Sequence, residues 1–252
     1  TSVARSMPGV IDIITNADLD IGPYPSANPL FDEAMIRPLL ADERVRFVGE
    51  PIVAIVADSP AMAADAAELI EVDYDSLDVL VDVEAALDSD VLLFEGTVEG
   101  NVVCRMEAEG LHPDFDSCEV VTQVRTINNR LAPAPLETRV AAAEWTADGR
   151  LHCFNAGQGP HPVRAVIASI LEIEKDQIRV VSRDVGGSFG MKGAMYPETP
   201  LSVWASQRYG RPVKWVSDRS EAFISDCHAR DKIVNTELAL DKDYNFLALR
   251  VH

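Results

Sequence analysis

Three glycines surround one serine and one phenylalanine in the sequence RDVGGSFG, residues 183–190. Gly186, Gly187 and Gly190 can adopt positive φ and have no side chain in the way of a ligand, so successive N–H groups could point at one anionic or oxo group. The same backbone would push Phe189 outward. Because sharp turns need glycine for their own geometry, the spacing alone favours a tight turn over a binding loop.

Two phosphate-binding motifs do not fit this loop. A dinucleotide-binding loop has Gly-x-Gly-x-x-Gly with an acidic residue about 20 residues later, and the glycine spacing here is different. A Walker loop has Ser or Thr directly after its Gly-Lys pair, whereas Lys192 is followed by Gly193. Neither nucleotide site is therefore predicted.

The sequence GGSFG does match the Gly-x-Ser-x-Gly pattern of a nucleophile elbow, with Ser188 as the nucleophile. The expected helix begins near Pro197, several residues too late for that elbow. Only His228 and His252 follow as possible bases. The hydrolase interpretation is disfavoured for these reasons.

A second candidate precedes the loop, in the sequence AGQGPHP. Gln158 lies between two glycines at the end of an expected strand and before an expected helix, so its amide would project into a cleft at the strand ends. A side-chain amide offers a donor and an acceptor and can bond an oxo or hydroxo group without adding charge. Taken alone, Gln158 and His161 are more typical of loop-stabilising residues than of ligands.

Composition predicts a globular chain with a packed core, since 47% of its 252 residues are hydrophobic. The net charge of -19 would repel nucleic acid. No run of about 18 apolar residues indicates a membrane span, and no signal peptide is visible. The cysteines are isolated, which excludes a zinc or iron–sulfur site and predicts buried thiols of a cytoplasmic protein; they are Cys104, Cys118, Cys153 and Cys227.

Residues 45–87 carry the clearest pattern of secondary structure. An apolar strand over 45–58 is followed by a helix that Ser59 caps and Pro60 begins. The alternation in LIEVDY, residues 69–74, predicts a second strand, and DVLVDVEAAL predicts a short third one. This segment is expected to form a strand–helix–strand unit.

The second half alternates strands with two helices. Strands are expected over 119–128, in a hairpin around Ala147–Gly149, over 175–185 and over 211–219, and the last 20 residues predict an antiparallel pair around 241–245. Helices are expected over 162–171 and from Pro197 to a stop at Gly210.

These elements predict an α+β chain of two domains, 1–87 and 119–252, joined by a connecting segment over 88–118 that is rich in Gly, Asp and Pro. The sequence begins in mid-pattern at Thr1 and stops inside an alternating strand at His252. We therefore expect it to be part of a longer polypeptide.

Several long segments together resemble the large, molybdenum-binding subunit of the xanthine dehydrogenase, aldehyde oxidase and carbon monoxide dehydrogenase superfamily. Residues 46–87 resemble its α/β hammerhead domain almost end to end. NAGQGPHPVRAVIASIL resembles its Ser-Thr-Gln segment and following helix, and IRVVSRDVGGSFGMKGAMYP resembles its Gly-Gly-Gly-Phe-Gly segment. Residues 210–252 resemble the carbon monoxide dehydrogenase-like branch.

The resemblance implies an α/β hammerhead domain followed by the first part of a molybdenum-cofactor-binding α+β domain. It implies cofactor-binding roles for Gln158, Gly186, Gly187, Phe189 and Gly190. Gln158 would bond an oxo ligand of molybdenum, and the Phe189–Gly190 backbone would lie against the apical ligand. Phe189 would also form a wall of the substrate pocket. The cofactor would be molybdenum–molybdopterin in its dinucleotide form, whose own sulfurs ligate the metal, so that no protein ligand to the metal is needed.

Three departures from the family pattern qualify these roles. Ser188 replaces the usual third glycine and adds a side chain beside the cofactor loop. Gly193 stands where purine hydroxylases carry a glutamate that contacts substrate, which disfavours a purine. The family's general base, a glutamate, is expected beyond His252, so no catalytic residue is assigned in this chain.

The implied reaction is oxidation of a small substrate, an aldehyde, an N-heterocycle or carbon monoxide, with oxygen derived from water. In that chemistry a metal-bound hydroxide attacks an electron-poor carbon while hydride passes to a sulfido ligand. The implied partners are the remainder of the large subunit, an iron–sulfur subunit and an FAD subunit, assembled as a dimer of heterotrimers. The alternative is a catalytically silent binding or assembly fragment, or a degenerate homologue, which Ser188 favours.

Overall fold

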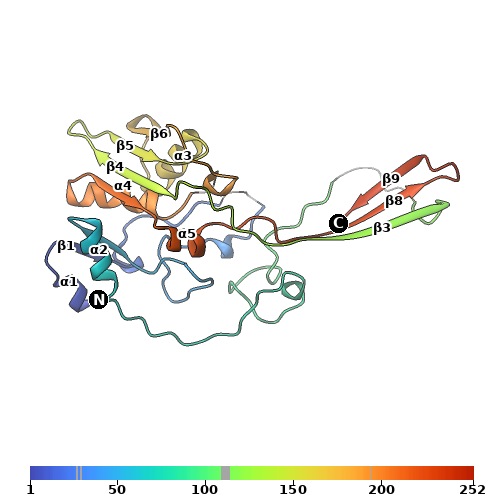
Figure 1. Cartoon of the computed structure of the whole chain (residues 1–252), viewed down its shortest axis with the longest axis horizontal. Coiled ribbons are helices and arrows are strands. Elements are labelled where there is room, and N and C mark those ends of the chain that lie inside the picture. The colour runs from blue at the N-terminus through green and yellow to red at the C-terminus, as the bar shows by residue number, and fades with distance from the viewer. Residues whose placement is uncertain (27, 29, 109–113, 194) are drawn as a thin grey trace.

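The computed structural model describes residues 1–26, 28, 30–108, 114–193 and 195–252. A body of helices and sheet contains both Gln158 and the glycine loop 186–190. A long three-stranded sheet, called the arm below, extends away from this body (Figure 1). Five short 3-10 helices lie in the connections, at Asn16–Asp18, Glu33–Met35, Ala85–Leu87, Lys175–Gln177 and Met191–Gly193. In the part of the chain that is described, no helix is long and apolar enough to cross a membrane.

A four-stranded sheet in the order β6-β5-β4-β7 forms the centre of the body. Its strands are β4 (Val140–Trp145), β5 (Leu151–Asn155), β6 (Ile178–Val181) and β7 (Val213–Val216). The β4–β5 hairpin turns through Gly149, whose φ of +80° favours glycine, as the sequence predicted. Strands β5 and β6 are parallel, so both end at the same edge of the sheet.

Two helices cover one face of this sheet. Helix α3 (Pro160–Leu171) begins with proline in its first turn, and α4 (Glu198–Tyr209) ends at Gly210 with φ of +61°. Ile167 of α3 and Val203 of α4 are fully buried against Leu151 and Cys153 of β5. Both predicted helices are confirmed, and their packing fixes the strand ends that carry the site.

The N-terminal segment packs against the same helices. It contains α1 (Ser2–Arg5), β1 (Val10–Ile14), β2 (Ala54–Ala57) and α2 (Pro60–Ala67). Ser59 caps α2 by accepting a hydrogen bond from the Met62 N–H, as expected. Ile14 and Leu40 share a buried cluster with Trp204 of α4, and the Tyr209 hydroxyl donates to Asp12 at 2.7 Å.

The predicted strand–helix–strand unit is confirmed only in part. Of the strand expected over 45–58 only Ala54–Ala57 forms, and the strands expected after the helix are wrong. Strand β2 pairs with β1, which precedes it in the chain, and residues 68–84 contain neither helix nor strand. Val79 and Val81 are largely exposed there. An alternating sequence forms a strand only where a neighbour accepts its backbone hydrogen bonds, and no described strand lies beside this segment.

The arm is an antiparallel sheet in the order β3-β8-β9. It consists of β3 (Val120–Asn128), β8 (Lys232–Leu240) and β9 (Phe246–Val251), and Asp241 holds the β8–β9 turn by accepting from the Asn245 N–H at 2.9 Å. These predicted strands are confirmed. Helix α5 (Arg219–Ser225), which precedes the arm, has no counterpart in the sequence-based prediction.

Candidate cofactor site

The glycine loop and the Gln158 loop leave the same edge of the sheet, after β6 and β5 respectively. Ser182 joins the two strand ends, since its hydroxyl donates to the Asn155 carbonyl at 2.7 Å and accepts from the Gly157 N–H at 3.3 Å. Further along, the Gln158 N–H donates to the Lys192 carbonyl at 3.2 Å. Residues about 30 positions apart in the sequence thereby form one surface.

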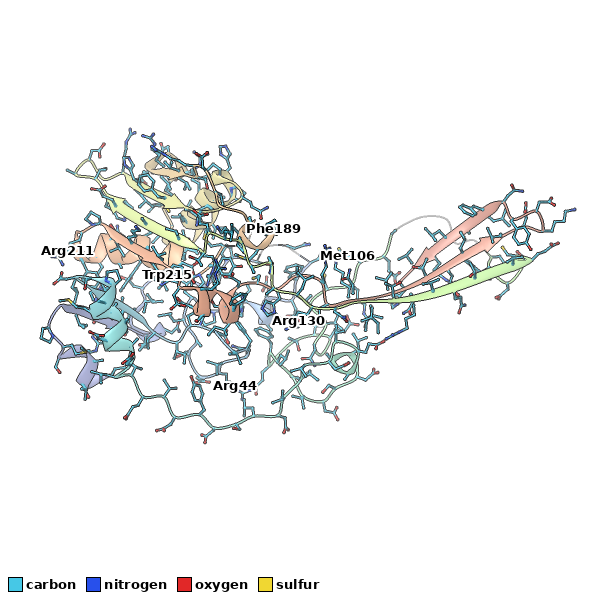
Figure 2. The ribbon with its side chains drawn as sticks, in the orientation of Figure 1. Arg44, Met106, Arg130, Phe189, Arg211 and Trp215 are labelled. Atoms are coloured by element: carbon cyan, nitrogen blue, oxygen red, sulfur yellow. The ribbon has the colours of Figure 1, made fainter. Side chains whose placement is uncertain are left out.

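Two positions in the loop require glycine for their conformation. Gly187 has φ of +98° and Gly190 has φ of +94°. A Cβ built on Gly190 would meet nothing within 4 Å, so the backbone is open to solvent there. Phe189 between them also has positive φ, at 55°, and its side chain is 74% exposed at the margin of the body (Figure 2).

Four successive backbone N–H groups, those of residues 187–190, have no acceptor among the described residues. Their neighbours are all engaged. The Gly186 N–H donates to Glu137, and the N–H groups of Met191 and Lys192 donate to the Ser188 carbonyl and hydroxyl. A run of free N–H groups in a loop with positive φ makes a concave anion- or oxygen-binding surface.

The side-chain amide of Gln158 lies beside these free N–H groups, and only one of its two polar atoms has a hydrogen-bond partner among the described residues. Its Oε1 accepts a hydrogen bond from the Ser188 hydroxyl. Its Nε2 donates to no other group in the described part of the chain. The site therefore presents an unsatisfied amide donor as well as the unsatisfied backbone donors.

An ion pair between buried Lys192 and half-buried Glu137 supports the loop. Lys192 has a side chain only 1% exposed, and its Nζ lies 2.7 Å from Oε2 of Glu137. The same carboxylate accepts from the Gly186 N–H at 2.9 Å, while the Glu137 N–H donates to the Gly186 carbonyl at 3.1 Å. Burial alone would raise the pKa of Glu137, but the hydrogen bonds from Lys192 and Gly186 hold that pKa below its usual value.

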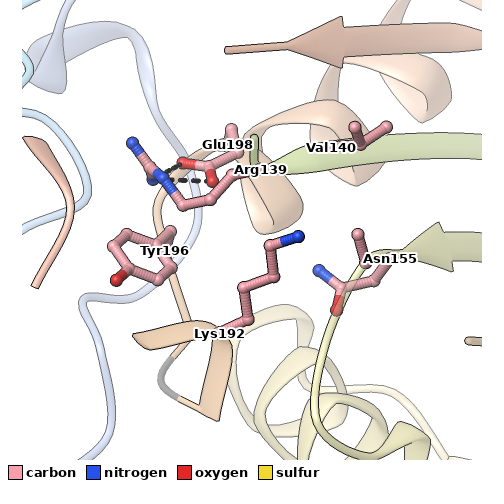
Figure 3. A pocket seen from close by; sticks show the side chains of 7 residues that line it. Arg139, Val140, Asn155, Lys192, Tyr196 and Glu198 are labelled. Carbon is pink, nitrogen blue, oxygen red and sulfur yellow. Dashed lines mark hydrogen bonds and ion pairs between the residues drawn. The ribbon is translucent and has the colours of Figure 1, made fainter. Parts of the chain in front are cut away.

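Lys192 also lines a cavity of about 10 Å³ (Figure 3). This volume can hold about one water molecule, so the cavity is too small for a cofactor or a substrate. Arg139 borders it and donates to both oxygens of Glu198 at 2.7 and 2.8 Å. Its guanidinium also stacks 4.0 Å from the centroid of the Tyr196 ring. The Tyr196 hydroxyl donates to the Met191 carbonyl, which links this network to the loop.

Burial raises the pKa of Glu198 to about 7, although Arg139 opposes this shift. Arg139 divides its donors between Glu198 and Asp226, to which its Nε donates at 2.7 Å. One guanidinium therefore serves two buried carboxylates. No sequence pattern predicted this network, because its members are scattered single residues without a recurring spacing.

The structure brings all five predicted cofactor residues to one edge of the sheet. Ser188 faces Gln158 and the Lys192 N–H rather than a histidine, which is contrary to a nucleophile elbow. His161 is exposed. The prediction of four buried thiols holds only for Cys153, because Cys104 and Cys118 are half-buried and Cys227 is exposed. In the described ranges no group of three His, Cys, Asp or Glu side chains is arranged to hold a metal ion.

The chain matches two family profiles. The profile described as "Molybdopterin cofactor-binding domain" matches residues 94–252, and the profile described as "Aldehyde oxidase and xanthine dehydrogenase, a/b hammerhead domain" matches residues 1–78. The free N–H groups and the Gln158 amide therefore lie within the segment that matches the cofactor-binding profile.

Individual relatives agree with these matches. The carbon monoxide dehydrogenase large chain of Afipia carboxidovorans is 35% identical over 100% of this chain and 33% of its own length. The nicotine 6-hydroxylase large subunit of Paenarthrobacter nicotinovorans is also 35% identical, over 100% of this chain and 32% of its own. The crystal structure of quinoline 2-oxidoreductase from Pseudomonas putida 86 aligns with a TM-score of 0.86 and 35% identity, covering 99% of this chain and 32% of that chain.

The chain thus spans about a third of the length of the relatives it matches. The mixed helix–sheet fold and the similarity along the whole of this chain point to the same family. The chain belongs to the family of molybdopterin-binding large subunits that includes xanthine dehydrogenase, aldehyde oxidase and carbon monoxide dehydrogenase.

Proposed function

We propose that this chain provides the cofactor-contacting part of a molybdenum hydroxylase, which oxidises a small electron-poor substrate with oxygen derived from water. The observation that carries the proposal is the run of free N–H groups at 187–190 beside the free Nε2 of Gln158. Donors without protein acceptors suit the oxygen-rich surface of a molybdopterin cofactor. The pterin dithiolene holds the metal through its own sulfurs, which fits a site without clustered protein ligands.

Each residue has a distinct proposed task. Gln158 donates its amide to an oxygen of the cofactor, and Phe189 with Gly190 offers backbone N–H groups and an open approach. Gly186 and Gly187 shape the path of the loop, and the exposed Phe189 ring forms one wall for the substrate. When bound, the cofactor supplies two-electron redox chemistry. The residues named here hold and orient it.

The finer features of the complete enzyme are also proposals. We propose the dinucleotide form of the cofactor, a general-base glutamate outside residues 1–252, and iron–sulfur and FAD partner subunits in a dimer of heterotrimers. The names of relatives as "large chain" or "large subunit" support a multi-subunit assembly. The four free thiols support a cytoplasmic location. Aldehydes, N-heterocycles and carbon monoxide stay open as substrates.

The proposed domain limits are 1–87 for the hammerhead domain and 119–252 for the cofactor-binding domain, with 88–118 as the connection. The described part of 88–118 contains no helix and no strand, which supports a connecting role. The alternative function, a catalytically silent binding or assembly module, rests on Ser188 in place of the usual glycine.

The test is to purify the complete natural complex that contains this chain and to measure its molybdenum and pterin content. We expect a stoichiometric content, and we expect Gln158→Ala to lower activity roughly 10- to 100-fold, as loss of a supporting contact to a metal centre commonly does. Gln207→Ala, an exposed amide on α4, is the matched control and should leave both quantities unchanged. A complex that is pure and active without molybdenum and pterin would overturn the proposal. An intact complex without activity towards any of the three substrate classes would favour the silent module.

A further inference from the structure

We propose that Ser188 is a positioning residue, whose hydroxyl fixes the Gln158 amide with its Nε2 directed to the cofactor as a donor. This inference rests on the proposed function, because it specifies how Gln158 meets the cofactor. It also reverses the expectation drawn from the sequence. From the sequence, Ser188 was expected to add a side chain that interferes with the cofactor loop, whereas in the structure its hydroxyl holds the Gln158 amide.

The two hydrogen bonds of the Ser188 hydroxyl determine the direction of the amide. The oxygen accepts from the Lys192 N–H at 2.9 Å, and a backbone N–H can only donate. The single hydroxyl proton is then available to Gln158, and it is donated to Oε1. An amide that accepts through Oε1 must present its Nε2 protons elsewhere, and no described residue takes them.

The opposite orientation of the amide is less favourable. If the Gln158 amide were turned over, Nε2 and the Lys192 N–H would both donate to the serine oxygen. The number of hydrogen bonds to the serine would stay at two, but the hydroxyl proton would lose its acceptor and Nε2 would be used on the serine instead of being free for the cofactor. The carbonyl end of the amide would also face the cofactor, where its partial negative charge would meet oxygen acceptors unfavourably.

Lys192, whose N–H holds the Ser188 oxygen, is itself held in place, so the hydroxyl is a fixed reference for the amide. The Lys192 carbonyl accepts from the Gln158 N–H at 3.2 Å, and the Lys192 side chain is anchored on Glu137 at 2.7 Å. Glycine at position 188 would leave the amide free to adopt both orientations. Ser188 is thus expected to raise the fraction of the complex whose donor is correctly directed.

A double-mutant cycle in the complete natural complex tests this inference. The variants are Ser188→Ala, Gln158→Ala and the combination of both, with Ser188→Thr as the variant that keeps the hydroxyl. The readouts are the molybdenum and pterin content and the electron paramagnetic resonance signal of Mo(V) in the reduced complex. That signal reports the surroundings of the metal directly.

We expect Ser188→Ala to shift the Mo(V) signal and to lower activity roughly 10-fold, as removal of a supporting hydrogen bond at a metal site does. The double variant should show little effect beyond Gln158→Ala alone, because the serine acts through the glutamine. Ser188→Thr should restore the wild-type signal. If a variant loses the signal, the same comparison is made in molybdenum content.

Additive effects of the two alanine substitutions, or a wild-type signal in Ser188→Ala, would overturn the role of Ser188. In either case the proposed function would stand if Gln158→Ala alone shifted the signal. A complex without molybdenum in its wild-type form would instead overturn the proposed function. The two failures are therefore distinguishable.

Discussion

At the scale of single residues, the ion pair of Lys192 and Glu137 connects both ends of the cofactor loop. Glu137 contacts Gly186 at the start of the loop, and Lys192 follows its last glycine bend. A Cβ built on Gly186 would lie only 2.5 Å from the Glu137 Cβ, so the loop also depends on close backbone approach there. The free N–H groups are therefore displayed by a loop whose two ends are tied to one carboxylate.

Lys192→Met should loosen this loop while preserving the volume of the side chain. The carboxylate of Glu137 would lose its cationic partner, at a cost of about 1–3 kcal/mol for a hydrogen-bonded charge. We expect hydrogen–deuterium exchange at the hydrogen-bonded amides of Gly186, Met191 and Lys192, followed in peptides covering 183–193, to become roughly 10-fold faster or more, and the pKa of Glu137 to rise. Lys175→Met, at an exposed lysine without an ion pair in the described structure, is the control. Equal exchange in the two variants would show that the pair does not hold the loop.

At the scale of elements, the first turn of α4 is joined to β4 through Glu198 and Arg139. Burial raises the pKa of Glu198 from 4.5 to about 7, which corresponds to about 3 kcal/mol of pH-dependent stability. Between about pH 4.5 and 7, Glu198 is therefore mostly protonated in the folded chain and mostly ionised in the unfolded chain. Stability from this group is present below that window and is lost as the pH rises through it.

We therefore expect exchange in peptides from α4 to become faster between pH 5 and pH 7.5, after correction for the intrinsic rate. Burial also raises the pKa of Glu221, which contributes in the same direction. Glu198→Gln should flatten most of this dependence because the amide does not titrate. Glu144→Gln, at an exposed position of β4, should leave the pH dependence as it is. A dependence that survives Glu198→Gln in full would assign it to other groups.

At the scale of the whole molecule, the arm has two unlike faces. The register places Val124 beside Thr236 and Val251 on one face, and Gln123 beside Glu237 and Arg250 on the other. The second face is internally paired, since Gln123 and Arg250 both donate to Glu237. Val124, Leu249 and Val251 are 57%, 63% and 59% exposed on the apolar face. An apolar sheet face of this kind favours association.

When the 252-residue chain is purified by itself, we expect it to self-associate through the apolar face of the arm. Val124→Lys combined with Leu249→Lys should shift it toward the monomer in sedimentation velocity, because two charges would have to be buried in the contact. The control is Gln123→Lys combined with Ala248→Lys, which adds the same two positive charges to the opposite face of the arm. A monomeric wild-type chain, or equal effects of the two pairs, would contradict the prediction.

Elements whose signals are local could be predicted from the amino-acid sequence. Ser59 and Pro60 predict the start of α2, Gly210 predicts the end of α4, and alternating residues predict the arm, since each signal acts within a few residues. The glycine loop and Gln158 were visible as candidates for the same reason. The family resemblance, which the comparisons bear out, joined them into one site.

Which partners these elements pack against became visible only in the folded chain. Residues 69–74 alternate like a strand, yet no strand of the described ranges lies beside them, while β2 pairs with β1, which precedes it in the chain. The Ser188–Gln158 hydrogen bond and the Lys192–Glu137 ion pair join residues 30 and 55 positions apart. Pairing and burial of this kind depend on contacts between distant segments, which no local pattern encodes. The serine that departs from the family pattern in the sequence is, for that reason, understood only from what it touches.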